Sequence, residues 1–175
     1  MNTEQIYQDN PAPLLLAMYR RLAQVPMAGC GVKNPVLSVD IAGFRRYRGD
    51  WLGAVVTPWF VRLFLLPGGG ELWQAPGNEA PAGKPLRVEF PAGDLEFLAE
   101  SNPDAEVPAF FWCPVFASVE RIGSQDEALT LAMEAFNSLF NPPPPAEVLD
   151  VPEVTERSKA PVDRRGFLRR LVGRG

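Results

Sequence analysis

The sequence predicts an α+β fold: a mostly antiparallel sheet of about five to six strands, with an N-terminal and a C-terminal helix packed on it. Apolar residues recur at helical spacing in two stretches, one near each end of the globular part. Between these stretches lie short runs rich in aromatic and β-branched residues, which suit buried strands. Glycine and proline separate the runs and mark the connections.

The first helix is predicted over Pro11–Gln24, where Asn10 serves as a cap and Pro13 fits the opening turn. Its apolar stripe consists of Leu14, Leu15, Met18 and Leu22. We expect this stripe to pack on the core rather than to bind a partner. The second helix is predicted over Ser124–Asn141, with Ser124 as its cap.

The chain is organised around Gly43 to Leu72, an extended stretch that opens with a predicted basic turn and closes at a glycine triplet. The arginines of that turn are Arg45, Arg46 and Arg48. They form either a solvated hairpin turn or a contact for an acidic partner. Two buried strands, Trp51–Thr57 and Trp59–Leu66, are expected to meet at a tight corner at Pro58, because proline inside a strand loses a ladder hydrogen bond.

The remaining strands are shorter. Gly43 is expected to turn the chain after the first of them, and Leu72-Trp73 to end another. The predicted segments are Val36–Ile41, Leu86–Phe90, Leu95–Glu100 (a strand or a short turn of helix) and Ala109–Val119, a buried strand interrupted by a proline.

Histidine is absent from the sequence. Its absence removes the commonest general base, the Ser-His and Cys-His nucleophile pairs, and the commonest metal ligand. The two cysteines, Cys30 and Cys113, form no CxxC pair, and we expect each to be a small buried side chain rather than a redox or metal residue. We therefore expect no catalytic residue, no metal and no cofactor, and the absence of a phosphate-binding glycine motif disfavours nucleotide binding.

The location of the protein is predicted from two further observations. The N-terminal residues carry Glu4 and Asp9 without a basic region, so they do not resemble a secretory signal. No apolar run reaches the roughly 20 residues that a membrane-spanning helix needs. We expect a cytoplasmic protein that binds no nucleic acid and touches membranes only through its tail.

Two sets of side chains are candidates for binding a partner. The aromatic set could line an apolar groove, although core packing is the alternative for each ring: Trp51, Trp59, Phe60 and Trp112. The acidic set comes from thirteen residues, 94–106, that hold five carboxylates and no lysine or arginine. Such a run is either a solvated face or a rim that receives arginines, since guanidinium and carboxylate pair bidentately. For the arginine-receiving role we select Asp94, Glu96, Glu100 and Glu106.

A proline block at residues 142–145 separates a globular domain, 1–141, from a tail, 142–175, that is predicted to be disordered and basic. The tail carries a motif similar to the twin-arginine export signal, formed by Arg164, Arg165, Phe167 and Leu168. Real export signals stand at the N-terminus, so this copy is not expected to direct export. Either the tail touches anionic surfaces or solubilises the chain, or it imitates a twin-arginine ligand and competes for its site.

Several motifs over residues 10–141 resemble the HybE/HupJ-type assembly chaperones of [NiFe] hydrogenases. The residues that carry the resemblance are Trp51-Leu52-Gly53, Thr57-Pro58-Trp59-Phe60 and Leu65-Leu66-Pro67-Gly68, with Asn34-Pro35, Gly43-Phe44 and Phe97-Leu98. The resemblance implies a non-enzymatic chaperone that binds the hydrogenase small-subunit precursor with its twin-arginine signal peptide and proofreads it before export. It also implies the large subunit and other accessory proteins as further partners. The alternatives are an adaptor that uses the basic tail on proteins or membrane surfaces and, least favoured, a carboxylate-based hydrolase.

Overall fold

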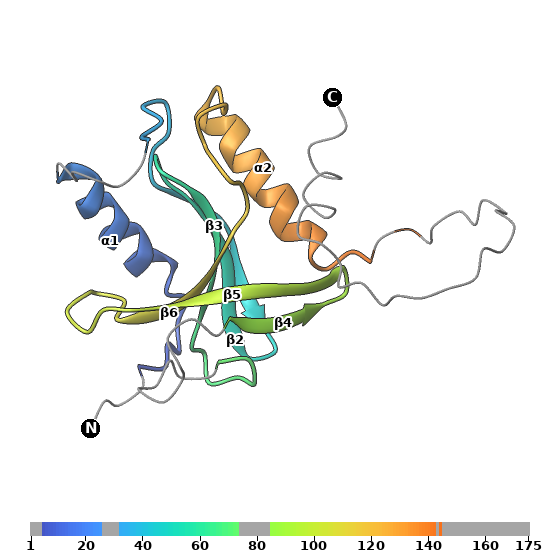
Figure 1. The fold of residues 1–175 in the computed structure, drawn as a ribbon. Coiled ribbons are helices and arrows are strands. Elements are labelled where there is room, and N and C mark those ends of the chain that lie inside the picture. The colour runs from blue at the N-terminus through green and yellow to red at the C-terminus, as the bar shows by residue number, and fades with distance from the viewer. Residues whose placement is uncertain (1–4, 26–31, 74–84, 143, 145–175) are drawn as a thin grey trace, which may run out of the picture.

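The computed structural model of the chain describes residues 5–25, 32–73, 85–142 and 144. Its elements, in chain order, are α1 (Ala12–Gln24), β1 (Asp40–Tyr47), β2 (Asp50–Val56), β3 (Val61–Leu66), β4 (Leu86–Phe90), β5 (Gly93–Ser101), β6 (Ala109–Pro114) and α2 (Gln125–Ser138). The six strands of the described part form one sheet in the order β1-β2-β3-β6-β5-β4, with every neighbouring pair antiparallel (Figure 1). The predicted α+β class, with one helix before the sheet and one after it, is confirmed.

Strand side chains alternate between two faces of the sheet, and both faces are buried at its centre. On β2, Leu52 and Val56 belong to a large core that includes Phe136 of α2, and we call this side the inner face. Val55, between them, belongs to a smaller core that includes Leu15 of α1, and we call this side the outer face. Figure 1 shows α1 and α2 on opposite sides of β3.

The sheet curls until its two edge strands meet at one end. Tyr47 of β1 stacks on Phe90 of β4, with ring centroids 5.1 Å apart and planes 19° apart. The Tyr47 hydroxyl donates a hydrogen bond to the backbone oxygen of Glu89 at 3.1 Å. Phe140, just beyond α2, packs edge-on against Tyr47 at 5.3 Å. The end of α2 therefore fills the inside of the curl.

The tight corner predicted at Pro58 is confirmed as the β2–β3 turn. The Thr57 N–H donates to the Phe60 oxygen at 2.9 Å. The Thr57 hydroxyl oxygen accepts hydrogen bonds from the N–H groups of Trp59 and Phe60, at 3.2 and 3.0 Å. One threonine side chain thus satisfies the two donors that the turn leaves outside the strand ladder.

Asn34 joins three connecting segments. Its backbone N–H donates to the Pro58 oxygen at 2.8 Å. Its buried side-chain amide donates to the backbone oxygens of Val119 and Ile122, at 2.8 and 2.9 Å. Its side-chain oxygen accepts from the Val36 N–H at 3.1 Å. Because a buried amide is costly when unpaired, these bonds fix the segment before β1 against the one before α2.

Asp50 is fully buried at the start of β2 and holds the glycine triplet. Its Oδ1 accepts from the N–H groups of Gly68 and Gly70 at 2.8 and 3.0 Å, and its Oδ2 from those of Leu72 and Trp73, both at 2.8 Å. The loop lies so close to the β1–β2 turn that a Cβ at Gly68 or Gly70 would fall 2.3 Å from a backbone oxygen of that turn. Both positions therefore require glycine.

The prediction for the first strand was wrong in its bounds. It placed the strand at Val36–Ile41 with a turn at Gly43, whereas β1 begins only at Asp40 and runs through that glycine. Gly43 has φ of +77° and forms a bulge, since the pairing register shifts between Ala42 and Phe44. The glycine bends the strand instead of ending it.

The predicted basic turn was also wrong in part. Arg45 and Arg46 lie within β1, and Arg48 lies in the turn that follows, with φ of 50°. The Arg45 guanidinium stacks over the Phe140 ring at 3.4 Å and that of Arg46 over the Trp51 ring at 4.6 Å. Two of the three arginines therefore cover aromatic rings of their own chain.

Two further strand bounds differ from the prediction. Leu72 and Trp73 belong to no strand in the described part, because Asp50 takes their N–H groups instead of a neighbouring strand. The predicted strand Ala109–Val119 ends at Pro114, although the next residue, Val115, still donates its N–H to the Val61 oxygen at 2.9 Å. By contrast, β5 shows that the segment for which strand and helix were both left open is a strand.

The cap predicted for the second helix is confirmed, because the Ser124 hydroxyl accepts from the Glu127 N–H at 3.1 Å. The cap predicted for the first helix was wrong by one position: Pro11 is the N-cap of α1, and Asn10, just before it, accepts from the Ala12 N–H at 2.9 Å. The apolar stripe of α1 is divided. Its members Leu15 and Met18 are buried, whereas Leu14 and Leu22 remain 40% and 36% exposed, so the prediction that the whole stripe packs on the core was wrong.

Cys113 is buried in the large core, as expected for a small apolar side chain. Cys30 and residues 145–175, which include the twin-arginine-like motif, lie outside the described residues. Within the described ranges no helix is long and apolar enough to cross a membrane. In the same ranges no group of three or more cysteine or carboxylate side chains is placed to hold a metal ion.

We predict that Asp50→Asn destabilises the fold by about 3 kcal/mol, because the new amide group faces buried N–H donors and leaves about two of them unpaired. Urea unfolding of the two proteins measures this difference. The matched control is Asp104→Asn at an exposed position, for which a change within about 0.5 kcal/mol is expected. Equal stability of the wild type and Asp50→Asn would contradict a role of the carboxylate in holding the loop.

Candidate partner-binding face

The outer face of the sheet carries a row of apolar side chains across its middle strands. Phe64 of β3 is the partner of Trp112 on β6, and Trp112 is the partner of Leu98 on β5. Directly paired residues of antiparallel strands point to the same side. Phe64 is fully buried beneath α1, whereas Trp112 and Leu98 are only half-buried. The apolar row therefore comes to the surface at β6 and β5.

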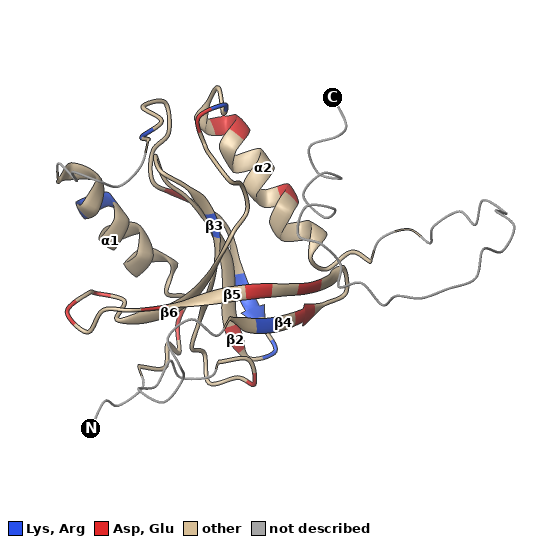
Figure 2. Cartoon of the chain, in the orientation of Figure 1, with Lys and Arg blue, Asp and Glu red and all other residues tan. Residues whose placement is uncertain are grey.

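Carboxylates continue this face along β5 and β4. Residues 94, 96, 98 and 100 of β5 share one side of the strand, opposite the fully buried Phe97 of the inner face. Glu89 of β4 is paired with Asp94 and so points the same way. We call this set the acidic row: Glu89, Asp94, Glu96 and Glu100. All four are exposed, and Figure 2 shows the acidic positions along β5 and β4.

An arginine is stacked at the centre of the face. The guanidinium of Arg62 on β3 lies 3.9 Å from the centroid of Phe60 and 3.7 Å from that of Trp112. Tyr19 of α1 packs edge-on against Phe60 at 5.4 Å. In the sequence Arg62 interrupts the apolar run from Trp59 to Pro67, and no binding role was predicted for it. The signal that could have identified it is this same isolation, since a lone arginine in a buried strand needs a partner for its charge.

Burial governs the electrostatics around Arg62. It raises the pKa of the Tyr19 hydroxyl above its ordinary value, and the charge of Glu100 raises that pKa further, while Arg62 opposes the rise. Burial also lowers the pKa of the Arg62 guanidinium, against the opposing effects of Tyr19 and Glu100. Glu100 thus lies close enough to Arg62 to offset part of its charge, at the end of the acidic row nearer α1.

The four predicted aromatic residues are half-buried, but they do not form one cluster. Phe60 and Trp112 flank Arg62, as described. Trp51 lies on the outer face of β2, where its indole N–H donates to the Tyr7 oxygen at 2.8 Å and so holds the segment before α1. Trp59 lies in the β2–β3 turn, with the Lys33 ammonium 5.9 Å from its ring.

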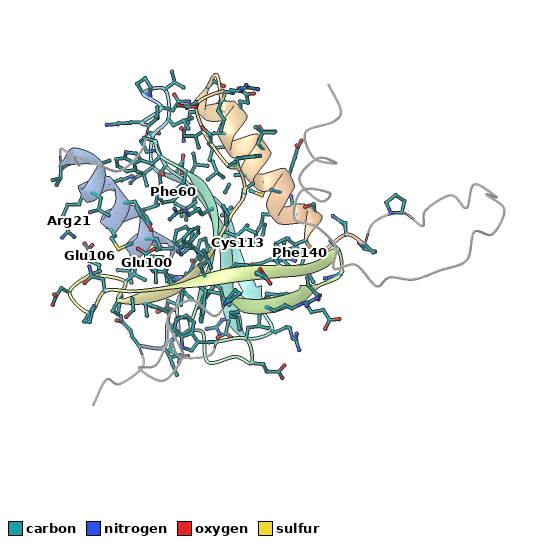
Figure 3. All side chains as sticks on the ribbon, viewed as in Figure 1. Arg21, Phe60, Glu100, Glu106, Cys113 and Phe140 are labelled. Atoms are coloured by element: carbon teal, nitrogen blue, oxygen red, sulfur yellow. The ribbon has the colours of Figure 1, made fainter. Side chains whose placement is uncertain are left out.

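Among the predicted arginine-receiving carboxylates, Asp94 and Glu106 bind arginines of this chain. Asp94 accepts a hydrogen bond from the Arg87 Nε at 2.7 Å. Glu106, in the connection before β6, forms an ion pair with Arg21 of α1, and Figure 3 shows these two side chains pointing toward one another beside Glu100. These contacts show that the face suits guanidinium groups. Glu96 and Glu100 lie further along β5.

A family model described as [NiFe]-hydrogenase assembly, chaperone, HybE matches residues 10–170. The chain belongs to this family. It is 31% identical over 157 residues to the hydrogenase expression/formation protein HupJ of Bradyrhizobium diazoefficiens, covering 89% of this chain and 85% of HupJ. It is 30% identical over 164 residues to the protein HoxT of Cupriavidus necator, covering 87% and 86%.

The fold of the family is seen in the solution structure of HybE from Escherichia coli, which matches with a TM-score of 0.61 and 22% identity over 90% of this chain and 93% of HybE. At that identity the likeness concerns the fold alone. The predicted membership of the HybE/HupJ chaperones is confirmed, and the matched range continues past residue 141 into the tail.

The motifs that suggested the HybE family have structural roles here. Thr57 closes the β2–β3 turn, Gly68 packs against Asp50, and Asn34 joins three connections. Phe44 fills the space above Gly53, where an added Cβ would lie 2.0 Å from the Phe44 ring. These residues build the sheet, and its outer face presents Trp112 and the acidic row.

We predict that Arg62→Lys destabilises the protein by about 1 kcal/mol, because lysine keeps the charge but loses the planar group that stacks between two rings. Arg87→Lys serves as the matched control. Its ion pair with Asp94 is exposed, so a loss of at most about 0.5 kcal/mol is expected. Urea unfolding measures both variants, and an equal loss in the two would argue against the stacking.

We predict that the free energy of unfolding falls as the pH rises above 10, partly because of Tyr19. Its pKa is raised from the ordinary value of 10.0 in the folded state, so the unfolded chain loses this proton first and gains stability relative to the folded one. The Tyr19→Phe variant lacks this contribution, so its free energy of unfolding should fall less steeply with rising pH. Denaturant unfolding between pH 9 and pH 11 compares the slopes, and identical slopes would contradict the raised pKa.

Proposed function

We propose that this HybE-family chaperone binds the precursor of a [NiFe]-hydrogenase small subunit in the cytoplasm. It recognises the twin-arginine signal peptide of the precursor, supports maturation and proofreads before export, without catalysing a reaction. The large subunit and other accessory proteins are further partners. Membership of the family supports a hydrogenase client. The choice of the signal peptide rests on the outer face of the sheet.

The observation that carries this proposal is the continuity of the acidic row with an apolar surface, on a face that is exposed among the described residues. Arginines of a peptide would pair bidentately with carboxylates such as Asp94 and Glu96. The apolar part of the same peptide would cover Leu98 and Trp112, which lie side by side in the strand register. Covering roughly 100 Å² of apolar surface contributes about 2.5 kcal/mol.

Arg62 sets the direction in which such a peptide lies. Its guanidinium repels other arginines from the Phe60 side of Trp112. The carboxylates farther from Arg62, at Asp94 and Glu96, are therefore the proposed place for the twin arginines, which would displace the exposed Arg87 from Asp94. The apolar residues that follow the arginines would then extend toward Trp112.

We predict that Asp94→Asn/Glu96→Gln weakens binding of a synthetic twin-arginine signal peptide at least about tenfold. The reason is the loss of charge-assisted hydrogen bonds worth roughly 1.5–3 kcal/mol each. Isothermal titration calorimetry on the full chain measures the affinity. Pull-down of the small-subunit precursor, with and without its signal peptide, shows whether binding of the whole precursor requires the signal peptide.

The matched control is Asp104→Asn/Glu134→Gln, which removes the same two charges at exposed positions off the acidic row. Its affinity should stay within about twofold of the wild type. A loss equal to that of the first variant would mean that net charge alone attracts the peptide. Capture of precursors that lack the signal peptide as efficiently as intact ones would refute signal-peptide recognition.

A further inference from the structure

The outer face of β5 lies close to the point where the chain leaves the described domain. The oxygen of Leu139, at the end of α2, accepts a hydrogen bond from the N–H of Ala92 at 3.1 Å. Ala92 belongs to the β4–β5 turn and precedes Asp94 by two residues. Figure 1 shows the end of α2 beside this turn. The residues after 141 therefore begin at one end of the acidic row.

The length of the connection suits the length of the row. Arg164 follows Asn141 by 23 residues. A flexible connection of that length spans roughly 25 Å, and the proline block extends it somewhat. The strand from Asp94 to Glu100 covers about 20 Å, since each residue adds about 3.4 Å. A segment tethered in this way reaches the row at an effective concentration on the order of millimolar.

The charges of the two parts are complementary. From residue 157 to the end the chain carries seven basic residues and one acidic residue. The outer face of β4 and β5 carries the four carboxylates of the acidic row and one guanidinium, that of Arg87. Leu98 lies on this face between Glu96 and Glu100, next to Trp112. The face thus offers carboxylates first and an apolar surface second, counted from the β4–β5 turn.

We propose that residues 164–168 of the same chain occupy this face when no client is bound. Arg164 and Arg165 lie among the carboxylates of the acidic row, and Phe167 and Leu168 cover Leu98 and Trp112. The order of the segment, arginines before apolar residues, is the order in which a chain arriving from the β4–β5 turn meets the two surfaces. The inference rests on the proposed function in one respect: the segment excludes a twin-arginine peptide from the site assigned above.

The first test uses the full ¹⁵N-labelled chain in solution. Arg164→Gln/Arg165→Gln should shift the amide signals of residues 94–100 and the indole signal of Trp112. The matched control, Arg170→Gln/Arg174→Gln, removes the same charge from the same tail outside the motif and should leave these signals near their wild-type positions. Unchanged β5 signals in the first variant, or equal shifts in both variants, would overturn docking of the motif.

Dilution decides whether the segment binds its own chain or a second copy. Docking within one chain leaves the β5 signals independent of protein concentration, whereas binding between chains makes them move on dilution. Movement toward the positions of Arg164→Gln/Arg165→Gln on dilution would overturn the intramolecular contact.

The second test separates this inference from the proposed function. A synthetic twin-arginine peptide should bind Arg164→Gln/Arg165→Gln at least about tenfold more tightly than the wild type. Equal affinity for the two proteins would overturn the competition while leaving signal-peptide recognition in place. Absence of binding to both would refute the proposed function, and the β5 signals of the first test would still decide whether the tail docks.

Discussion

The buried carboxylate of Asp50 determines where the N-terminal third of the molecule lies. An unpaired charge at this depth would cost several kcal/mol, and four N–H groups of the glycine loop offset that cost. The loop in turn presents the Pro67 oxygen to the N–H of Tyr7 at 2.9 Å. The Trp51 indole N–H and the Arg46 guanidinium donate hydrogen bonds to the backbone oxygen of Tyr7. The path of the chain into α1, and so the cover over one half of the outer face, follows from this one ionised group.

The curl of the sheet explains why recognition would use a face rather than an edge. The Gly43 bulge bends β1, and Tyr47 then reaches Phe90 across the opening. The Tyr47 hydroxyl donates a hydrogen bond to the backbone oxygen of Glu89. This oxygen is one of the backbone acceptors at the edge of β4 with which an added strand would have to pair. Within the described residues α2 lies inside the curl and α1 packs on β1 to β3, whereas the outer face of β5 and β4 carries exposed side chains.

Much of the fold could be predicted because its signals are local. The Ser124 cap, the Pro58 corner and the alternation of β4 each depend on residues a few positions apart. The role of Gly43 could not be read in the same way, because a positive φ suits a turn and a bulge equally. The choice between them depends on Phe136, almost a hundred residues away, which packs against this glycine.

The candidate site was predictable in composition but not in arrangement. Aromatic and acidic residues were identified by type, and the register of β5 and β6 places Leu98, Trp112 and Glu96 on one face. The sequence gives no comparable sign that Trp51 holds the segment before α1, because its partner Tyr7 is 44 residues away. Neither Asp50 nor Arg62 was singled out from the sequence, because the groups that each contacts lie in other segments of the chain.

The position of Arg62 makes the two ends of the outer face differ in charge, and this difference bears on the orientation of a bound peptide. The stacked guanidinium of Arg62 offsets part of the negative charge at the Glu100 end of the row, while Arg87 pairs with Asp94 at the other end. A polypeptide with arginines followed by apolar residues lowers its energy in one orientation on such a surface and raises it in the reverse one. The proposed client peptide and the proposed tail segment share that order. In either complex Arg62 would disfavour the reverse orientation, and a neutral residue in its place would leave both orientations open.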